Sequence, residues 1–316
     1  MSARIGFGCA SLGSRVSARA GTRTLMRAFD AGVTWFDVAP SYGDGAAESI
    51  LGAAFAGRRD QVTLCTKVGI LPPAPSLAKR LAKPLLRTAL ALAPQLRQHV
   101  RRHRPAAVKP PLVASAIEPG IEASLRRLGT DYVDVLALHD AAPEEVVRDD
   151  ILRALERVVT AGKARRISIA SSVPAVLAGI TAADIFSVAQ VANNISQRDL
   201  KALVAALPDG REITTVTHTV FGASGLVDRA ADAVRNAPDL AAMLNEAGYH
   251  GDALQQVRSF LPDFAFASNE GGIVLLSMFS AGHLEANLSR LAQAPDPNVV
   301  LKIANWISEN CNLPLR

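Results

Sequence analysis

The sequence predicts a single (β/α)₈ TIM barrel, and three observations support this fold class. The first is length, because 316 residues accommodate one barrel, which typically needs about 250 residues, together with an insertion. The second is the alternation of short apolar runs with amphipathic stretches, which is typical of parallel strands joined by crossover helices. The third is that the apolar runs number eight, the strand count that closes such a barrel.

The predicted elements follow one another along the whole chain. The strands are expected at residues 5–8, 34–38, 62–67, 133–138, 166–170, 187–191, 213–217 and 272–277. The helices are expected at residues 22–31, 48–56, 116–128, 144–161, 198–206 and 283–292. Gly32, Gly129 and Gly162 each follow a predicted helix, where a glycine favours helix termination. The expected domain organisation is therefore one barrel over residues 1–316.

Residues 70–113 are expected to form a basic helical insertion after the third strand. They form a connection far longer than the usual loop of about two to six residues. Between Ile70 and Ile117 the chain has no Asp or Glu but carries nine Lys and Arg residues. Leucines repeat there every four residues, which is a helical spacing, and Pro84 and Pro94 interrupt the pattern. We expect two or three short helices on the catalytic side of the barrel.

The basic insertion has three interpretations. The favoured one is a solvated helical flap whose leucines pack on the barrel. The second is a lid that attracts an anionic substrate. The third is peripheral contact of residues 77–104 with an anionic membrane surface. Nucleic acid is not an expected partner, because the segment lacks aromatic residues among its cations and the rest of the chain carries 25 basic against 29 acidic residues.

Four polar residues lie where predicted strands end. Asp37, Lys67 and His139 each close an apolar strand, and Tyr42 lies in the loop that follows Asp37. The carboxyl ends of barrel strands meet at one face, so these four side chains are expected to converge there. Any one of them alone is more often a cap or a loop contact. Their occurrence at consecutive strand ends favours a shared catalytic site.

The chemistry of these four residues suits the reduction of a carbonyl group. A tyrosine has an unperturbed pKa of about 10 and holds its proton at neutral pH. Lys67 is expected to lower the pKa of Tyr42, with Asp37 keeping the lysine charged and in place. His139 can orient the substrate oxygen. We therefore expect Tyr42 to act as a general acid in reduction and as a general base in oxidation.

Long stretches of the chain resemble the aldo-keto reductase family. The motifs that carry the resemblance are GFG at 6–8, FDAGVTWFDVA at 29–39, SYGDG at 41–45, TKVG at 66–69, IEASLRRLGTDYVD at 121–134 and GKAR at 162–165. By this resemblance Asp37, Tyr42, Lys67 and His139 occupy the family's catalytic tetrad. The resemblance also implies a (β/α)₈ barrel and a bound nicotinamide cofactor.

The resemblance further implies a set of cofactor-binding residues, which departs from the family pattern in places. Ala170-Ser171 stands where the family usually has Ser-Asn to hold the carboxamide. Gln190 matches the family's glutamine beneath the nicotinamide, and Asn194 lies nearby. His218 stands where the family has an aromatic stacking residue, and Asn287 matches its adenine-side asparagine. Phe279 replaces a basic residue that often grips the 2′-phosphate of NADP. The cofactor is therefore NADP or NAD: the family favours NADP, and Phe279 makes NAD plausible.

Several other classes of site receive no support from the sequence. Cys9, Cys65 and Cys311 are widely spaced and are read as reduced thiols in a cytoplasmic protein. The N-terminus shows no apolar signal region, and no apolar run has the length of a membrane span. His99 and His103 share a helical spacing but lack a third ligand, so no metal site is expected.

The sequence thus predicts an NAD(P)-dependent oxidoreductase acting on an aldehyde, a ketone or a sugar hydroxyl. The substrate is expected to be a small molecule, and an anionic one under the lid interpretation of the insertion. The alternative function is a cofactor-sensing or interaction module of the same fold, with little catalysis, that docks through its basic insertion. Departures among the cofactor residues motivate this alternative.

Overall fold

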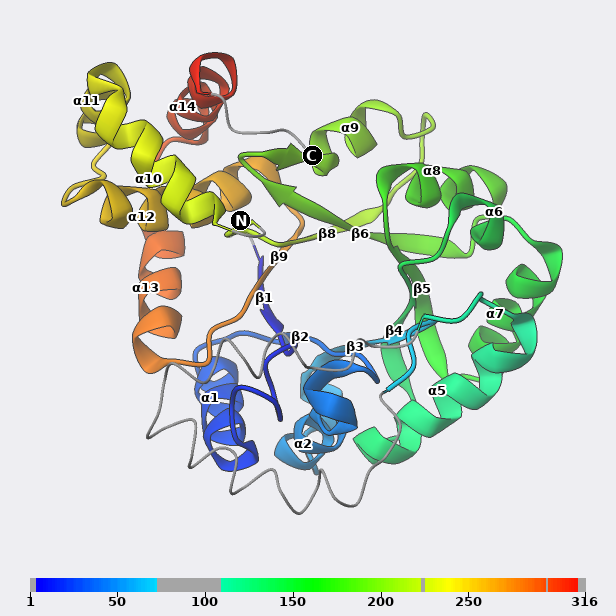
Figure 1. Cartoon of the computed structure of the whole chain (residues 1–316). Coiled ribbons are helices and arrows are strands. Elements are labelled where there is room, and N and C mark those ends of the chain that lie inside the picture. Colours follow the sequence, from blue (N-terminus) through cyan, green and yellow to red (C-terminus); the bar gives the residue numbers. More distant parts are fainter. Residues whose placement is uncertain (1–3, 73–108, 223–224, 294, 312–316) are drawn as a thin grey trace.

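Eight parallel strands form a closed ring in the computed structural model, which describes residues 4–72, 109–222, 225–293 and 295–311. Strand β1 pairs with both β2 and β9, and β5 pairs with β6, which closes the ring (Figure 1). The strands are β1 (Arg4–Gly8), β2 (Trp35–Asp37), β3 (Thr63–Val68), β4 (Val133–His139), β5 (Ala164–Ala170), β6 (Phe186–Asn194), β8 (Thr214–His218) and β9 (Ile273–Leu276). The short β7 (Gln197–Arg198) pairs antiparallel with β6 outside the ring. The predicted TIM barrel and its eight strands are confirmed.

Helices surround the ring on its outer side (Figure 1). The first half of the chain contributes α1 (Ala18–Asp30), η1 (Tyr42–Gly45), α2 (Ala47–Ala54), η2 (Arg59–Gln61), α5 (Ala114–Leu128), α6 (Pro143–Val146), α7 (Asp149–Thr160) and α8 (Val173–Ala182). The second half contributes α9 (Asp199–Ala205), α10 (Leu226–Asn236), α11 (Pro238–Glu246), α12 (Ala253–Ser268), α13 (Ala281–Ala292) and α14 (Pro297–Asn310). None of the helices in the described ranges is both long and apolar enough to cross a membrane.

The helix predicted at 144–161 is wrong as a single element, because the structure divides it into α6 and α7. Arg148 adopts an extended backbone between them, with φ −70° and ψ 129°. Its guanidinium donates two hydrogen bonds to the carboxylate of Asp150, at 2.7 and 3.1 Å. Asp149 and Asp150 then begin α7, where carboxylates are favoured by the positive end of the helix dipole.

Two of the helices that the sequence did not predict have sequences that lack the usual helical pattern. The sequence of α8, VPAVLAGITA, is apolar on nearly every face and therefore shows no amphipathic stripe. The interior of α12 contains Pro262, a residue that argues against a helix because its ring displaces a backbone hydrogen bond. Pro262 is buried among the core residues of that helix.

The apolar core has an inner and an outer part. The inner part fills the barrel and consists of Trp35, Cys65, Val135, Ala137, Ala170, Val188, Val216, Ile273 and Leu275. The larger outer part lies between the strands and the helices and includes Phe7, Phe36 and Phe55. The barrel interior is therefore packed with side chains and is not a channel.

A partly buried ion pair holds α13 against α12. Asp263 of α12 accepts hydrogen bonds from Arg290 of α13 at 2.6 and 3.0 Å and from the hydroxyl of Tyr249 at 2.9 Å. The guanidinium also lies over the Tyr249 ring, 5.2 Å from its centroid. This network fixes the helix that carries Asn287.

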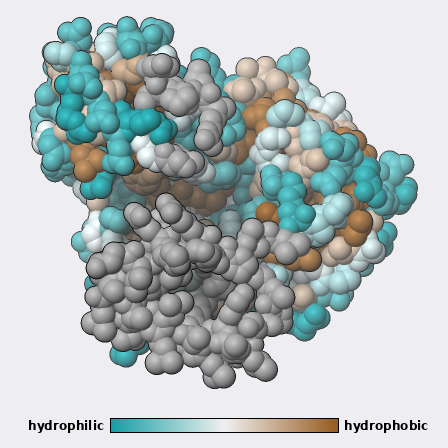
Figure 2. Space-filling view, in the orientation of Figure 1, coloured by the Kyte–Doolittle hydropathy of each residue, from teal (hydrophilic) through white to brown (hydrophobic). Residues whose placement is uncertain are grey.

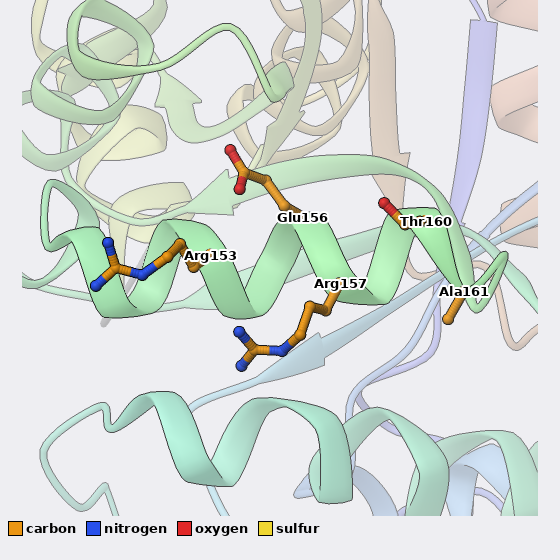
Figure 3. A pocket seen from close by; sticks show the side chains of 5 residues that line it. All are labelled: Arg153, Glu156, Arg157, Thr160 and Ala161. Carbon is orange, nitrogen blue, oxygen red and sulfur yellow. The ribbon is translucent and has the colours of Figure 1, made fainter.

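Figure 2 shows one face of the molecule. Hydrophilic side chains cover much of the described surface, and hydrophobic ones gather toward the middle of the view (Figure 2). A depression on the outside of α7 is lined by Arg153, Glu156, Arg157, Thr160 and Ala161 (Figure 3). Arg157 reaches from there to Glu118 of α5 at 2.7 Å. This depression lies on the outer side of a helix and is separate from the strand ends where the candidate catalytic residues lie.

Most of the predicted basic insertion cannot be compared with the structure. Its residues 73–108 lie outside the described residues, and so do the segment 77–104 and the pair His99 and His103. Among the residues that the structure does describe, no group of three or more His, Cys, Asp and Glu side chains is placed to hold a metal ion.

Candidate active site

The structure brings the four predicted catalytic residues to one face of the barrel. Asp37 ends β2, Lys67 lies one residue before the end of β3, and His139 ends β4. Tyr42 begins η1, after a turn in which its amide donates to the carbonyl of Ala39 at 3.0 Å. The parallel register of these strands sets their carboxyl ends side by side, as the sequence predicted.

Lys67 and Asp37 form a buried ion pair at the centre of the site. The Lys67 Nζ contacts Asp37 Oδ1 and also donates to the carbonyl of Val38 at 3.2 Å. Each of the two residues is only 3% exposed. Burial by itself lowers the pKa of Lys67, but the negative charge of Asp37 outweighs burial and raises that pKa above its ordinary value. Lys67 is therefore a fixed positive charge at every physiological pH.

Tyr42 lies beside this charge, with the Lys67 Nζ 5.1 Å from the centroid of its ring. Lys67 acts on the phenol pKa in the expected direction, but it does not decide the sign of the net shift. Burial raises the pKa of Tyr42 above its ordinary value, while the charge of Lys67 and a hydrogen bond to it act in the lowering direction. The lysine thus limits an increase that burial would otherwise impose, and Tyr42 keeps its proton through the neutral range.

His139 stands almost perpendicular to Tyr42, with ring centroids 6.1 Å apart and an interplanar angle of 87°. Burial, followed by the charge of Lys67, lowers the pKa of His139 to about 3. The imidazole is consequently neutral at physiological pH and has one N–H to donate. Its Nδ1 is buried and has no hydrogen-bond partner among the described residues.

The residues that follow the two histidines of the site both adopt the left-handed backbone region. Asp140 follows His139 with φ +58°, and Thr219 follows His218 with φ +62°. Residues other than glycine rarely adopt this region because Cβ approaches the backbone. The amide of Asp140 donates to the carbonyl of Ala170 at 2.8 Å, and the Asn194 amide donates to the carbonyl of Thr219 at 3.1 Å.

Two groups of supporting residues were missed by the sequence reasoning. Glu48 is 1% exposed and accepts hydrogen bonds from Thr66, the neighbour of Lys67, and from Arg127. Lys109 pairs with Asp140 at 2.9 Å and contributes to the low pKa of His139. The available signal for Glu48 was its position as the only charged residue of α2. Lys109 belongs to a run of cations in the sequence, which concealed it.

With this geometry in place, comparison with known proteins defines the family. A sequence model of the aldo/keto reductase family matches residues 4–304. The chain belongs to this family. The resemblance seen in the sequence motifs is thereby confirmed, and it extends beyond the motifs into the last third of the chain.

Similar proteins support the assignment to the aldo/keto reductases. "Aldo-keto reductase YhdN" of Bacillus subtilis is 28% identical over 222 residues, which cover 68% of this chain and 57% of that protein. "D-threo-aldose 1-dehydrogenase" of a Pseudomonas species is 31% identical over 239 residues, 71% of this chain and 67% of the relative. The crystal structure of an aldo-keto reductase from Klebsiella pneumoniae in complex with NADPH shows the same fold. It has a TM-score of 0.65 at 20% identity and covers 96% of this chain and 90% of that one. The chain thus spans little more than half the length of the Bacillus relative.

The predicted cofactor residues of this aldo/keto reductase lie around the same face, with one exception. Ser171 follows β5 and donates to the carbonyl of Ala141 at 2.7 Å, and Gln190 lies within β6. His218 ends β8, and its pKa is lowered to about 4, mainly by burial. Asn287 lies apart from these, buried on α13 outside the ring.

The amide of Gln190 leaves one polar atom without a partner. Its Nε2 donates to the sulfur of Cys65 at 3.1 Å, whereas its Oε1 is buried and has no hydrogen-bond partner among the described residues. Burial raises the pKa of the Cys65 thiol, so this sulfur stays protonated. Both polar atoms of the Asn194 side chain, by contrast, have partners, because its Oδ1 accepts from the amide and hydroxyl of Ser196 at 3.0 Å.

Proposed function

We propose that this aldo/keto reductase is a nicotinamide-dependent oxidoreductase that interconverts a carbonyl group and a hydroxyl group, with Tyr42 as the general acid/base. The buried Lys67–Asp37 pair, with its ammonium 5.1 Å from the Tyr42 ring centroid, is the observation that carries the proposal. A fixed cation beside a phenol stabilises the phenolate that forms when the phenol gives up its proton. His139, neutral and next to Tyr42, completes the arrangement.

In the direction of reduction, the substrate oxygen lies between Tyr42 and His139. The N–H of the neutral imidazole donates a hydrogen bond to the carbonyl oxygen and orients it. The Tyr42 hydroxyl transfers its proton to that oxygen, and Lys67 stabilises the resulting phenolate. In the direction of oxidation, the phenolate removes the proton from the substrate hydroxyl, which restores the phenol. Positioned proton transfer of this kind typically contributes about 10²- to 10⁴-fold in rate.

The residues present fit a nicotinamide dinucleotide. The unpartnered Oε1 of Gln190 and the hydroxyl of Ser171 offer acceptors for the carboxamide, and the His218 ring offers a surface for stacking. Asn287 on α13 would bind the adenine side. The cofactor supplies or accepts the hydride, which no side chain can do. The NADPH complex of the Klebsiella protein supports this choice of cofactor. Phe279 offers no charge to the 2′-phosphate of NADP, so binding measurements with both cofactors decide between NADP and NAD.

The proposed substrates are small aldehydes, ketones or sugars. The name of the Pseudomonas relative, a D-threo-aldose 1-dehydrogenase, supports the sugar class. Lys109 places a positive charge near His139, which would favour an anionic substrate, although Asp140 partly neutralises it. The neutral members of the class are therefore proposed as the principal substrates.

Replacement of Tyr42 by Phe tests the proposal. This change should lower turnover of a panel of aldehydes, ketones and aldoses by about 10²-fold or more, while NADPH or NADH still binds. Tyr132→Phe is the matched control, because the Tyr132 ring lies between Arg59 and Arg165 and takes no part in the site. Unchanged turnover in Tyr42→Phe would contradict the assigned role.

A fluorescence titration with NADPH and with NADH distinguishes the alternative function. Binding of either cofactor together with turnover of any panel member supports the oxidoreductase. Absence of binding to both would instead favour an interaction module of the same fold.

A further inference from the structure

We propose a second binding site, for a small organic carboxylate, at the end of the barrel opposite to the catalytic residues. A cavity of about 360 Å³ opens there, a volume within the range of small-molecule sites. Arg4, Thr63 and Thr214, the first residues of β1, β3 and β8, line it. The catalytic residues lie at the carboxyl ends of strands, so the two sites are separated along the barrel axis.

The lining of this cavity is positively charged. Arg166 of β5 and Arg4 both contribute to it, and none of the described lining residues is acidic. The Arg166 Nη1 donates to the hydroxyl of Thr214 at 3.3 Å, and its guanidinium lies 5.7 Å from the centroid of the Trp35 ring. Neither arginine forms an ion pair with a described acidic residue. A guanidinium presents several N–H donors in a plane, which matches the two oxygens of a carboxylate.

Trp35 provides an independent indication of a ligand. It lines the same cavity, is 6% exposed, and its Nε1 has no hydrogen-bond partner among the described residues. An indole N–H is only a donor, and buried donors are nearly always paired in folded proteins. An acceptor oxygen bound in the cavity would satisfy it. Arg166 has an acceptor in Thr214 but no anionic partner among the described residues, so a carboxylate bound beside it would serve both Arg166 and Trp35.

The remaining wall determines the class of anion. Leu288 and Leu291 of α13, Val33 and Ile273 line the cavity together with the cations. Apolar surface of this kind favours a ligand with an apolar body. Inorganic phosphate would match the charges and leave this surface exposed to water. A carboxylate carried on a small hydrocarbon or aromatic group satisfies both parts of the lining.

Tryptophan fluorescence gives a direct test, because the chain has only two tryptophans. A Trp306→Phe protein retains Trp35 as its single tryptophan reporter. Benzoate should change the Trp35 emission saturably, whereas benzamide, which has the same shape without the charge, should not. Tyr42→Phe in this background should leave the benzoate titration unchanged, because the catalytic face is distant.

Substitution of the cations tests the assigned residues. Arg166→Gln keeps a donor for Thr214 but removes the charge, and it should weaken benzoate binding by about tenfold or more. Arg165→Gln is the matched control, since Arg165 is the adjacent residue of β5 and pairs with Asp134 instead. If Arg166→Gln does not fold, Arg4→Gln at the exposed start of β1 should weaken binding in the same direction.

Three results would overturn the existence of the site, and a fourth would overturn the class of ligand. One is no saturable response to benzoate, and another is an equal response to benzamide. The third is equal weakening by Arg165→Gln and Arg166→Gln. Inorganic phosphate that binds as tightly as benzoate would overturn the carboxylate assignment, because the apolar wall would then contribute nothing. Turnover by Tyr42 is not involved in any of these measurements, so their failure is distinct from failure of the proposed activity.

Discussion

Glu48 accepts a hydrogen bond from the hydroxyl of Thr66 at 2.6 Å, one residue before Lys67. The other oxygen of Glu48 accepts from the Arg127 Nε at 2.5 Å, and Arg127 in turn donates to the hydroxyl of Ser124 at 3.1 Å. This chain of contacts ties α2 and α5 to the strand that presents Lys67. A carboxylate of α2 therefore helps to hold the strand that carries Lys67, whose ammonium is fixed by Asp37 and Val38.

Glu48→Gln should destabilise the protein with little direct effect on the chemistry. The change removes the charge that pairs with Arg127, and Glu48 is almost fully buried. Because Arg127 is partly exposed, we expect a loss of about 2–3 kcal/mol in the free energy of unfolding, below the full cost of a broken buried pair. Urea denaturation measures it. Glu156→Gln on the exposed face of α7 is the control, and an equal cost for both substitutions would contradict the prediction.

Lys67→Met and Asp37→Asn should each lower the free energy of unfolding, and the double variant should be more stable than either single variant. Lys67→Met leaves the Asp37 carboxylate buried without its cation, which should cost about 3–5 kcal/mol. The double variant removes both charges and should recover most of that loss. Turnover should remain at least about 10²-fold low in Lys67→Met and in the double variant, because both lack the cation beside Tyr42. Recovery of turnover in the double variant would contradict the role given to Lys67.

His139 should make the folded state less stable in acid. Its pKa is about 3 in the folded protein, against about 6.5 for a free histidine. Between these values the unfolded chain binds a proton that the folded chain does not. Stability is therefore complete above about pH 6.5 and falls as the pH drops toward 3. In His139→Asn the urea midpoint should fall less steeply over this range, and His218 should leave a residual slope. Identical slopes in both proteins would refute the assignment.

Phe279→Arg should shift cofactor preference toward NADPH. Phe279 packs edge-on against Phe7, with ring centroids 4.9 Å apart, at the position that the sequence resemblance matches to a basic residue. A guanidinium at this position could pair with a 2′-phosphate, and one charge-assisted hydrogen bond corresponds to about tenfold or more in affinity. The ratio of NADPH to NADH dissociation constants measures the effect. Phe279→Gln is the control, since it removes the ring without adding charge and should leave the ratio unchanged.

Local sequence patterns were sufficient to predict the barrel and the convergence of the four candidate catalytic residues. Apolar strands alternating with amphipathic helices specify the (β/α)₈ order, and Asp37, Lys67 and His139 interrupt those strands at their carboxyl ends. The topology then brings these residues together without further information, because all parallel strands of a barrel end at one face. The division of 144–161 into α6 and α7 was not predictable in this way, since it depends on the side-chain contacts of Arg148.

Tertiary structure alone decided the pKa shifts of the candidate site and the cavity lined by Arg166 and Trp35. The direction in which the pKa of Tyr42 shifts depends on how deeply the phenol is buried, and no sequence motif indicates burial. The pairing of Arg166 with Trp35 joins β5 to β2, which are more than a hundred residues apart in the chain. Sequence by itself determined which chemical groups the protein has and at which strand ends they occur. Folding determined their distances and their exposure to water, on which charge interactions and ligand binding depend.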